Sequence, residues 1–383
     1  MKKIRTVLGD IAPEELGFTS MHEHTIAKQM QSGLVMMKNL PTLMKAGEAY
    51  QNGEDVKAET QRRIELGIND FPKMTFEGSQ GASKLFKKNP ARKLNDIEYF
   101  TNELLAFKNA GGNALLDCSP FARVSSDQYQ ELSKKSGIHL LTCSGFYVKA
   151  GIPKKYRKGG ILTMRHMVEY ELEHGDGKSS ARPGFLKCAF GTLENGMLAE
   201  SEKNALITCA SVAEERGMAI EIHLAFPLRQ QHVLEAADIL INSVGISSEK
   251  VVFCHLDSIS LGAGNPVAKI NEYGYDATLA LKLVDKGFNV SFDAWGNAMG
   301  DRSMTDYLDD TRYVFLKEMI SQGYAEHIVL GHDLLSKAAG VQNGGCGYTR
   351  FPNYLREHLP ADGLNVELLD VMAVKNPARI LAF

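Results

Sequence analysis

Four histidines, one aspartate and one lysine in this sequence have the side-chain types of metal ligands. His22 and His24 stand one residue apart in the stretch GFTSMHEH, so in an extended chain both imidazoles point to the same side. A His-x-His pair alone is a weak signal, because such pairs also occur by chance. The further candidates lie in or at the end of short apolar runs and are Lys187, His223, His255 and Asp333.

Lys187 is unusual because it interrupts the apolar run GFLKCAFG. A lysine is rarely buried unless it is paired, since burial disfavours the charged form and lowers the pKa of the amine. A neutral amine can combine with carbon dioxide to form a carbamate, which is an anionic oxygen ligand able to bridge two cations. The alternative is an unmodified lysine that forms an ion pair with a buried acid such as Glu221.

The mixture of imidazole and carboxylate ligands indicates which ions would bind. Such a site suits divalent zinc first, with cobalt, manganese or iron as alternatives. Two such ions share a water and lower its pKa towards neutrality, so hydroxide becomes available as a nucleophile. The cysteines form no C-x-x-C pair, and we expect those in apolar runs to pack as small buried side chains. These cysteines are Cys118, Cys143, Cys188 and Cys254.

Eight short apolar runs alternate with segments of helical pattern. Strands that alternate with helices form parallel βα units, and eight units close a (β/α)8 TIM barrel of the α/β class. Active sites of this fold lie at the carboxyl ends of the strands, which is where the candidate ligands stand. The runs are Phe18–Thr25, Asn113–Ser119, Ile138–Phe146, Gly184–Phe190, Met218–Ala225, Val251–His255, Phe288–Ala294 and Ile328–Asp333.

The remaining pattern fits a single domain over residues 1–383. The Lys3–Leu8 run predicts an extra strand outside the eight. The segment 27–94 is too long for one loop and carries four methionines at helix-compatible spacing. We interpret it as a helical insertion. Its methionines could fill an irregular gap in the core, or the insertion could form a lid over the barrel mouth.

Composition excludes several classes of partner. The net charge of the 383 residues is −3, which leaves no large basic surface for nucleic acid. No stretch approaches the roughly 20 apolar residues of a membrane span, and the first apolar run is too short for a signal peptide. We therefore expect a cytoplasmic protein that acts on a small molecule, with neither nucleic acid nor membrane as partner. A homodimer is the default expectation for its assembly.

The order of these motifs resembles the phosphotriesterase-like family of the amidohydrolase superfamily. The resemblance lies in TVLGDI, in GFTSMHEH, in the lysine, histidines and aspartate of the later strands, and in the closing NPARIL. It runs from Thr6 to the end of the chain, except for the insertion at 27–94. Members of that family have a TIM barrel with a binuclear metal centre. The resemblance therefore implies that this chain is a metal-dependent hydrolase.

The resemblance also assigns the ligands to two metals. His22, His24 and Asp333 would hold the more buried ion, and His223 and His255 would hold the more exposed one. The carboxylated side chain that bridges the two ions would come from Lys187.

Two departures bear on the substrate. Family members often carry His or Arg just after an acid on strand 7, whereas this chain reads Asp293-Ala294-Trp295. Tyr147 stands where lactonase-type relatives have tyrosine and paraoxon-hydrolysing relatives have tryptophan. Both features favour a lactonase over a specialised organophosphate hydrolase. The Tyr147 hydroxyl would orient the substrate, although plain aromatic packing is the alternative.

The predicted reaction is attack of the bridging hydroxide on a polarised lactone carbonyl, with Asp333 taking up the proton for the leaving alkoxide. Lys149 opens a basic loop after strand 3, and Arg229 follows strand 5. These cations would grip an anionic group, unless they form only a solvated surface. The sequence thus favours a sugar lactone that carries a phosphate or similar group. The alternatives at the same centre are hydrolysis of a phosphotriester, a phosphodiester, a carboxyl ester or an amide. A catalytically silent barrel is a further alternative, but it would require that one of the metal ligands be missing from the sequence.

Overall fold

Parallel strands form the centre of the molecule. The computed structural model describes residues 2–27, 95–121, 124–176, 179–225, 228–261, 273–297, 302–334 and 336–383. Within these ranges, eight strands form one sheet in which neighbours along the chain are also neighbours in space. They are β3 (Thr19–Glu23), β4 (Ala114–Asp117), β5 (His139–Gly145), β6 (Phe185–Phe190), β9 (Ile220–Leu224), β10 (Val251–Phe253), β11 (Asn289–Phe292) and β12 (Ile328–Leu330). Each lies inside one of the eight predicted runs.

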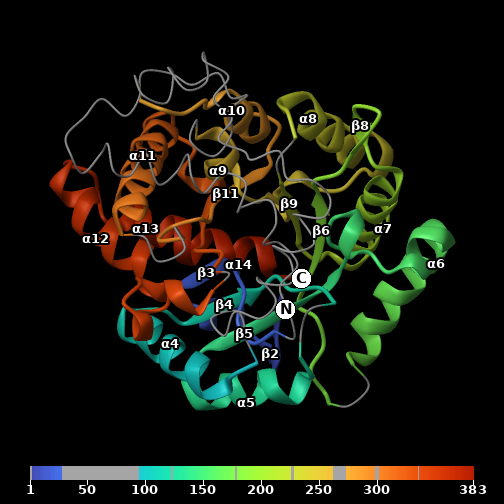
Figure 1. Cartoon of the computed structure of the whole chain (residues 1–383), viewed down its shortest axis with the longest axis horizontal. Coiled ribbons are helices and arrows are strands. Elements are labelled where there is room, and N and C mark those ends of the chain that lie inside the picture. Colours follow the sequence, from blue (N-terminus) through green and yellow to red (C-terminus); the bar gives the residue numbers. More distant parts are fainter. Residues whose placement is uncertain are drawn as a thin grey trace, which may run out of the picture.

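Helices form an outer ring around these strands (Figure 1). The ring and the parallel sheet confirm the predicted (β/α)8 barrel. The helices are α4 (Ile97–Asn109), α5 (Ser126–Ser136), α6 (Lys154–His174), α7 (Glu200–Arg216), α8 (Gln230–Asp238), α9 (Leu256–Ser260), α10 (Thr278–Val284), α11 (Arg302–Ser321), α12 (Arg350–Ala361), α13 (Glu367–Asp370) and α14 (Asn376–Leu381).

Helix α4 shows why the sequence folds locally in this way. The side chain of Asp96 accepts a hydrogen bond from the Tyr99 N–H at 3.0 Å and so caps the first turn. Phe100, Leu104 and Phe107 recur at helical spacing and are buried. The cap fixes where the helix begins, and the apolar stripe holds it against the sheet.

The inside of the barrel has its own apolar cluster. Alternate strand residues point inwards, as Leu116 and Cys118 do in and just after β4. At one end of the barrel, Ile4, Ile380 and Leu381 join this cluster and cover the amino ends of the strands. The opposite end, where the carboxyl ends of the strands lie, carries the candidate ligands. All six cysteines are free thiols, and the four predicted as buried are buried.

The N-terminal segment differs from its prediction. Instead of one strand over Lys3–Leu8, it forms an antiparallel hairpin of β1 (Ile4–Thr6) and β2 (Gly9–Ile11). The turn arises because Thr6 Oγ1 donates to the carbonyl of Gly9 at 2.8 Å and Gly9 has a φ of 130°. A second short antiparallel hairpin, β7 (Leu193–Glu194) and β8 (Met197–Leu198), follows β6.

The predicted insertion at 27–94 lies, from residue 28 onwards, outside the described residues. Its proposed helices and its role as a lid therefore stay predictions. In the part of the chain that the structure describes, no helix has the length and the apolar character that a membrane span requires.

Candidate metal centre

The six predicted ligands come together at the carboxyl ends of the strands. His22 belongs to β3, Lys187 to β6 and His223 to β9, while His24, His255 and Asp333 lie within three residues after the ends of β3, β10 and β12. Among the described residues, two sets of three ligand atoms from these side chains lie within 4.8 Å of one another. One set is His22, His24 and Asp333, and the other is His22, His223 and His255. Because His22 belongs to both sets, the two sites are neighbours.

The first set joins the two ends of the sheet. Asp333 Oδ1 lies 3.1 Å from His24 Nε2 and 3.8 Å from His22 Nε2. His22 and His24 are buried, and Asp333 is nearly so. The Asp333 N–H also donates to the carbonyl of His22 at 3.1 Å. A carboxylate and two imidazoles at these distances form a donor set that fits a divalent cation.

The second set contains a very close pair of imidazoles. His255 Nε2 lies 2.6 Å from His223 Nδ1, and the ring centroids are 4.4 Å apart. Two nitrogens at that distance cannot both carry a proton. Burial, together with positive neighbours such as His255 and Lys187, lowers the pKa of His223 well below its usual value. His22 is affected in the same way, so both rings are neutral and have lone pairs to offer a metal.

Acidic and hydroxyl groups orient these ligands from behind. Asp293 Oδ1 lies 2.8 Å from His255 Nδ1, and the same carboxylate accepts the His255 N–H at 3.1 Å. Ser119 Oγ lies 2.7 Å from His24 Nδ1. Such groups fix the tautomer and direction of a metal-binding imidazole. Sequence reasoning gave neither residue this role, although the acid near the end of the seventh apolar run was a usable signal.

Glu23 and His332 form a further buried pair that sequence reasoning missed. Glu23 Oε1 lies 2.6 Å from His332 Nδ1 and accepts the His332 N–H at 2.8 Å. Each partner is adjacent in the chain to candidate ligands, Glu23 to His22 and His24 and His332 to Asp333. The pair therefore fixes the ligands of β3 relative to the ligand that follows β12.

The Asp293 carboxylate leads to a prediction for pH. Burial lowers the pKa of His255, but Asp293 and Asp333 outweigh it and raise the pKa to about 9. A metal must displace this proton, so its apparent affinity should fall roughly tenfold per pH unit below pH 9. Titration of Co²⁺ against a chromophoric chelator between pH 6 and 9 would measure the slope. In Asp293→Asn the decline should begin at lower pH, and a pH-independent affinity in the native chain would contradict the assignment.

The pKa of Lys187 differs from the expectation based on burial alone. Its Nζ lies 3.4 Å from Glu221 Oε2 and 3.3 Å from His22 Nδ1. Burial disfavours the charged amine, but Cys118, Cys254 and Glu221 outweigh this effect and raise its pKa well above the usual value. The ion pair with Glu221, the alternative for this lysine, is thus the arrangement in the structure. The sequence analysis already named Glu221 as the acid of this alternative, and the structure gives its distance from the amine.

Comparison with known proteins identifies the family of this chain. The model of the phosphotriesterase family matches residues 2–381. The chain belongs to this family. N-acetyltaurine hydrolase of Xenopus tropicalis is 23% identical over 407 residues, which cover 100% of this chain and 98% of the relative. The predicted family is therefore confirmed, and this phosphotriesterase-family protein is a hydrolase.

Solved structures of the same fold cover nearly the whole chain. A phosphotriesterase homology protein from Escherichia coli, solved with phosphate in its active site, has a TM-score of 0.68 at 19% identity. The match covers 96% of this chain and 99% of that one. A lactonase from Listeria monocytogenes also has a TM-score of 0.68 at 19% identity, over 99% of this chain and 98% of that one. These similarities establish the TIM barrel of the phosphotriesterase family for this chain.

Tyr147 contacts one of the candidate ligands in this phosphotriesterase-family barrel. Its hydroxyl lies 3.2 Å from His223 Nε2, on the opposite side of the ring from the Nδ1 that faces His255. Burial and the nearby Asp333 raise the pKa of the tyrosine, so the hydroxyl keeps its proton at neutral pH. The contact orients the His223 ring, which is more than plain aromatic packing, and the role of Tyr147 in orienting the substrate stays a prediction.

The predicted anion-binding cations occupy more exposed places. Lys149 Nζ forms an ion pair with Glu194 of the β7–β8 hairpin. Arg229 is exposed and precedes the first residue of α8. The basic residues from Lys154 onwards are on α6, not on a loop as predicted, because Pro153 stands at the N-cap of a helix. Their contribution to substrate binding stays a prediction.

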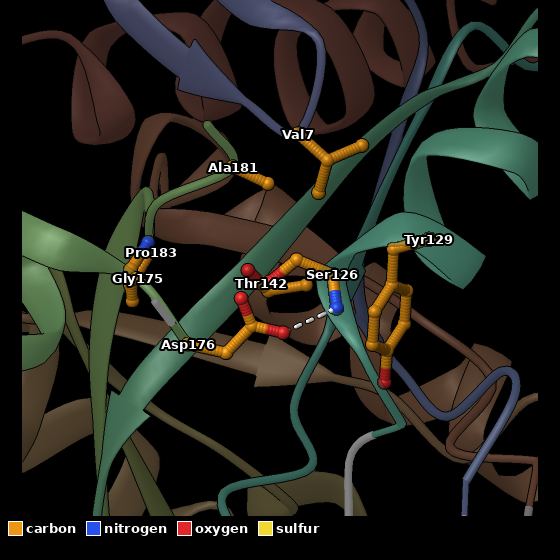
Figure 2. A pocket seen from close by; sticks show the side chains of 8 residues that line it. All are labelled: Val7, Ser126, Tyr129, Thr142, Gly175, Asp176, Ala181 and Pro183. Atoms are coloured by element: carbon orange, nitrogen blue, oxygen red, sulfur yellow. Dashed lines mark hydrogen bonds between the residues drawn. The ribbon is translucent and has the colours of Figure 1, made fainter. Parts of the chain in front are cut away.

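A small pocket lies on the outer side of β5, away from the candidate ligands. Figure 2 shows the Asp176 carboxylate next to the first turn of α5, where it accepts the Ser126 N–H at 2.8 Å. The pocket is lined by Val7, Ser126, Tyr129, Thr142, Gly175, Asp176, Ala181 and Pro183. Since none of the candidate ligands lines it, this pocket is separate from the candidate centre.

Proposed function

We propose that the chain is a metal-dependent hydrolase whose two neighbouring cation sites are built by His22, His24, Lys187, His223, His255 and Asp333. The observation that carries the proposal is that His22 is shared by two sets of candidate ligand atoms, each within 4.8 Å, and by a third set with Glu221 and Cys254. Membership of the phosphotriesterase family supports it. Imidazole and carboxylate donors suit zinc first, with cobalt, manganese or iron as alternatives.

Lys187 enters this proposal as a carbamate. Its ammonium group lies within 3.5 Å of both His22 nitrogens, so the positive charge would repel any cation bound there. Loss of one ammonium proton, addition of carbon dioxide to the neutral amine and loss of a second proton, both protons going to bulk solvent, would convert the repelling cation into an anionic oxygen ligand. Glu221 then loses its ion-pair partner and keeps the thiol of Cys118, whose Sγ donates to Glu221 Oε2 at 2.9 Å.

When bound, the two divalent ions would lower the pKa of a shared water and polarise the substrate carbonyl. The protein side chains do the remaining work. Asp333 accepts a proton at its carboxylate and passes it to the leaving group. Asp293 holds the His255 ring through Nδ1, and Tyr147 holds the His223 ring through Nε2. The other nitrogen of each ring faces the neighbouring imidazole.

The favoured substrate is a lactone that carries an anionic group. Tyr147 and the absence of His or Arg directly after Asp293 favour a lactone over a phosphotriester, as in the resemblance to lactonase-type proteins. The basic residues that follow β5 and β9 favour an anionic substituent, such as the phosphate of a sugar lactone phosphate. The lactonase neighbour supports this choice.

A second candidate is an amide of an anionic amine. The N-acetyltaurine hydrolases align over the whole chain, and N-acetyltaurine combines an acetyl amide with a sulfonate group. Both candidates present an acyl carbonyl to the centre and an anion to the rim. They differ in the leaving group, which is an alkoxide in a lactone and an amine in an amide.

The deciding experiment is a substrate screen with the metal-reconstituted protein. Plain and phosphorylated sugar lactones, N-acetyltaurine and aryl phosphotriesters should be compared by kcat/KM. The proposal expects the highest value for an anionic acyl substrate. Preference for aryl phosphotriesters would overturn the acyl assignment, and absence of turnover with every divalent metal would overturn the hydrolytic centre.

The anionic group leads to a prediction for the rim. Arg229→Met should raise KM for a phosphorylated lactone about tenfold and leave KM for the plain lactone unchanged, because only the charged substrate loses a partner. Lys149→Met should act in the same direction but less strongly, since Glu194 already pairs with this amine. Arg356→Met offers a matched surface control. Equal changes for both lactones would contradict the anion contact.

A further inference from the structure

The turn that follows β11 is held by buried charged side chains. The N–H of Ala294 donates to Asp257 Oδ2 at 3.1 Å, and the N–H of Gly296 donates to both carboxylate oxygens of Asp309 at 3.2 Å. The buried guanidinium of Arg312 connects the two acids, with Nε 2.5 Å from Asp257 Oδ2 and Nη1 bonded to Asp309 Oδ1. A buried, fully paired network of this kind fixes the main chain that it binds.

Packing restricts the same turn. The Trp295 ring is fully buried, lies 5.5 Å from the Arg312 guanidinium and 5.4 Å from the Tyr354 ring. Gly296 has a φ of 71°, and a Cβ at this position would come within 3.0 Å of Arg350 Cβ. The turn therefore has little freedom to take another conformation.

Asn297 is the residue that this turn presents to the candidate centre. Its Nδ2 donates to the main-chain carbonyl of Asp333 at 2.5 Å. Asp333 has a φ of 50°, a left-handed conformation that residues with a side chain rarely adopt. Its N–H is held by the carbonyl of His22 at 3.1 Å. Asn297 thus supplies the second of two main-chain bonds that hold a strained residue.

We propose that Asn297 is a positioning residue for Asp333. Its amide holds the strained main chain, so that the Asp333 carboxylate faces His24. The buried network of Asp257, Arg312 and Asp309 acts one step further away, because it fixes the turn that carries Asn297. Family members often carry His or Arg in this part of the barrel. This chain has the Asn297 amide there, which holds the main chain of Asp333. The inference rests on the proposed role of Asp333 as a metal ligand.

The test uses Asn297→Ala and Asn297→Asp in the full chain reconstituted with Co²⁺. The second variant keeps the shape of the side chain and replaces the donating amide by an acceptor. Both should lower kcat by about 10–100-fold, the usual loss for a group that orients a metal ligand, with KM within about threefold. The visible absorption spectrum of bound Co²⁺ should change, while the unfolding transition of the apo protein stays close to that of the native chain.

Asn343→Ala is the matched control, because its amide also donates to a main-chain carbonyl, that of Lys337 at 2.7 Å. It should leave the Co²⁺ spectrum and kcat unchanged. Native spectra and kcat in both Asn297 variants, with Asp333→Asn impaired, would overturn the inference and leave the proposed function intact. If the Asn297 variants lose the Co²⁺ spectrum only to the extent that they lose folded protein, the residue serves stability alone and the inference would also be overturned. A native chain that takes up no Co²⁺ would overturn the proposed function itself.

Discussion

Lys187→Ala is expected to lower hydrolysis by at least about a hundredfold, since loss of a group that merely orients a metal ligand already costs about 10–100-fold. The side chain is 1% exposed, and its amine lies next to His22 and Glu221. Removing it deletes the bridging anion and leaves space in the interior of the barrel. A small carboxylic acid such as propionate can place its carboxylate in that space, so added propionate should restore part of the activity.

Lys250→Ala is the control for this experiment. Its amine donates to the carbonyl of Ile380 at 2.9 Å, at the far end of the barrel. The variant should lose some stability but keep its specific activity. Unchanged activity in Lys187→Ala would contradict the carbamate. So would an unmodified amine on Lys187 in crystals of the native protein grown with bicarbonate and zinc.

Asp333→Asn should lower kcat by roughly 10²–10⁴-fold, the range for loss of a general acid–base group. Asparagine tolerates the left-handed conformation at this position, so the main chain should be retained. The change removes the negative charge that lies 3.1 Å from His24 Nε2, and with it the acceptor for the proton. Kinetics with the best substrate of the screen, together with the metal content per chain, would measure the effect.

Asp362→Asn provides the comparison, because this exposed acid pairs with Lys317 far from the ligands. Its kcat and metal content should match those of the native chain. A kcat for Asp333→Asn within about threefold of the native value would show that proton transfer does not pass through this residue.

The fold could be predicted from the sequence because each strand is visible as an apolar run with its own helix partner. In a barrel, the carboxyl end of every strand is on the same rim, so His223 and His255 could be placed near His22 without a structure. The regular topology, rather than the histidine motif alone, gave this information.

Other features depend on residues that meet only in the folded chain. The pKa of Lys187 is raised by Cys118, Cys254 and Glu221, which come from other parts of the chain and together outweigh the effect of burial. Lys149 is paired because the β7–β8 hairpin brings Glu194 to it. Asn297 follows a turn whose shape depends on acids of α9 and α11. No local pattern in the sequence contains these distances.

The ring of strands is joined by side chains as well as by main chain where its first and last members meet. The two edges, β3 and β12, are linked by the main-chain bond from Asp333 to His22 and by the buried pair of Glu23 and His332. The proposed ligands stand on both sides of this seam. A cation held between them would stabilise the closed barrel further, so uptake of the ion and stability of the fold would be thermodynamically linked. Metal supply in the cell would then govern how much of the chain survives as well as how fast it works.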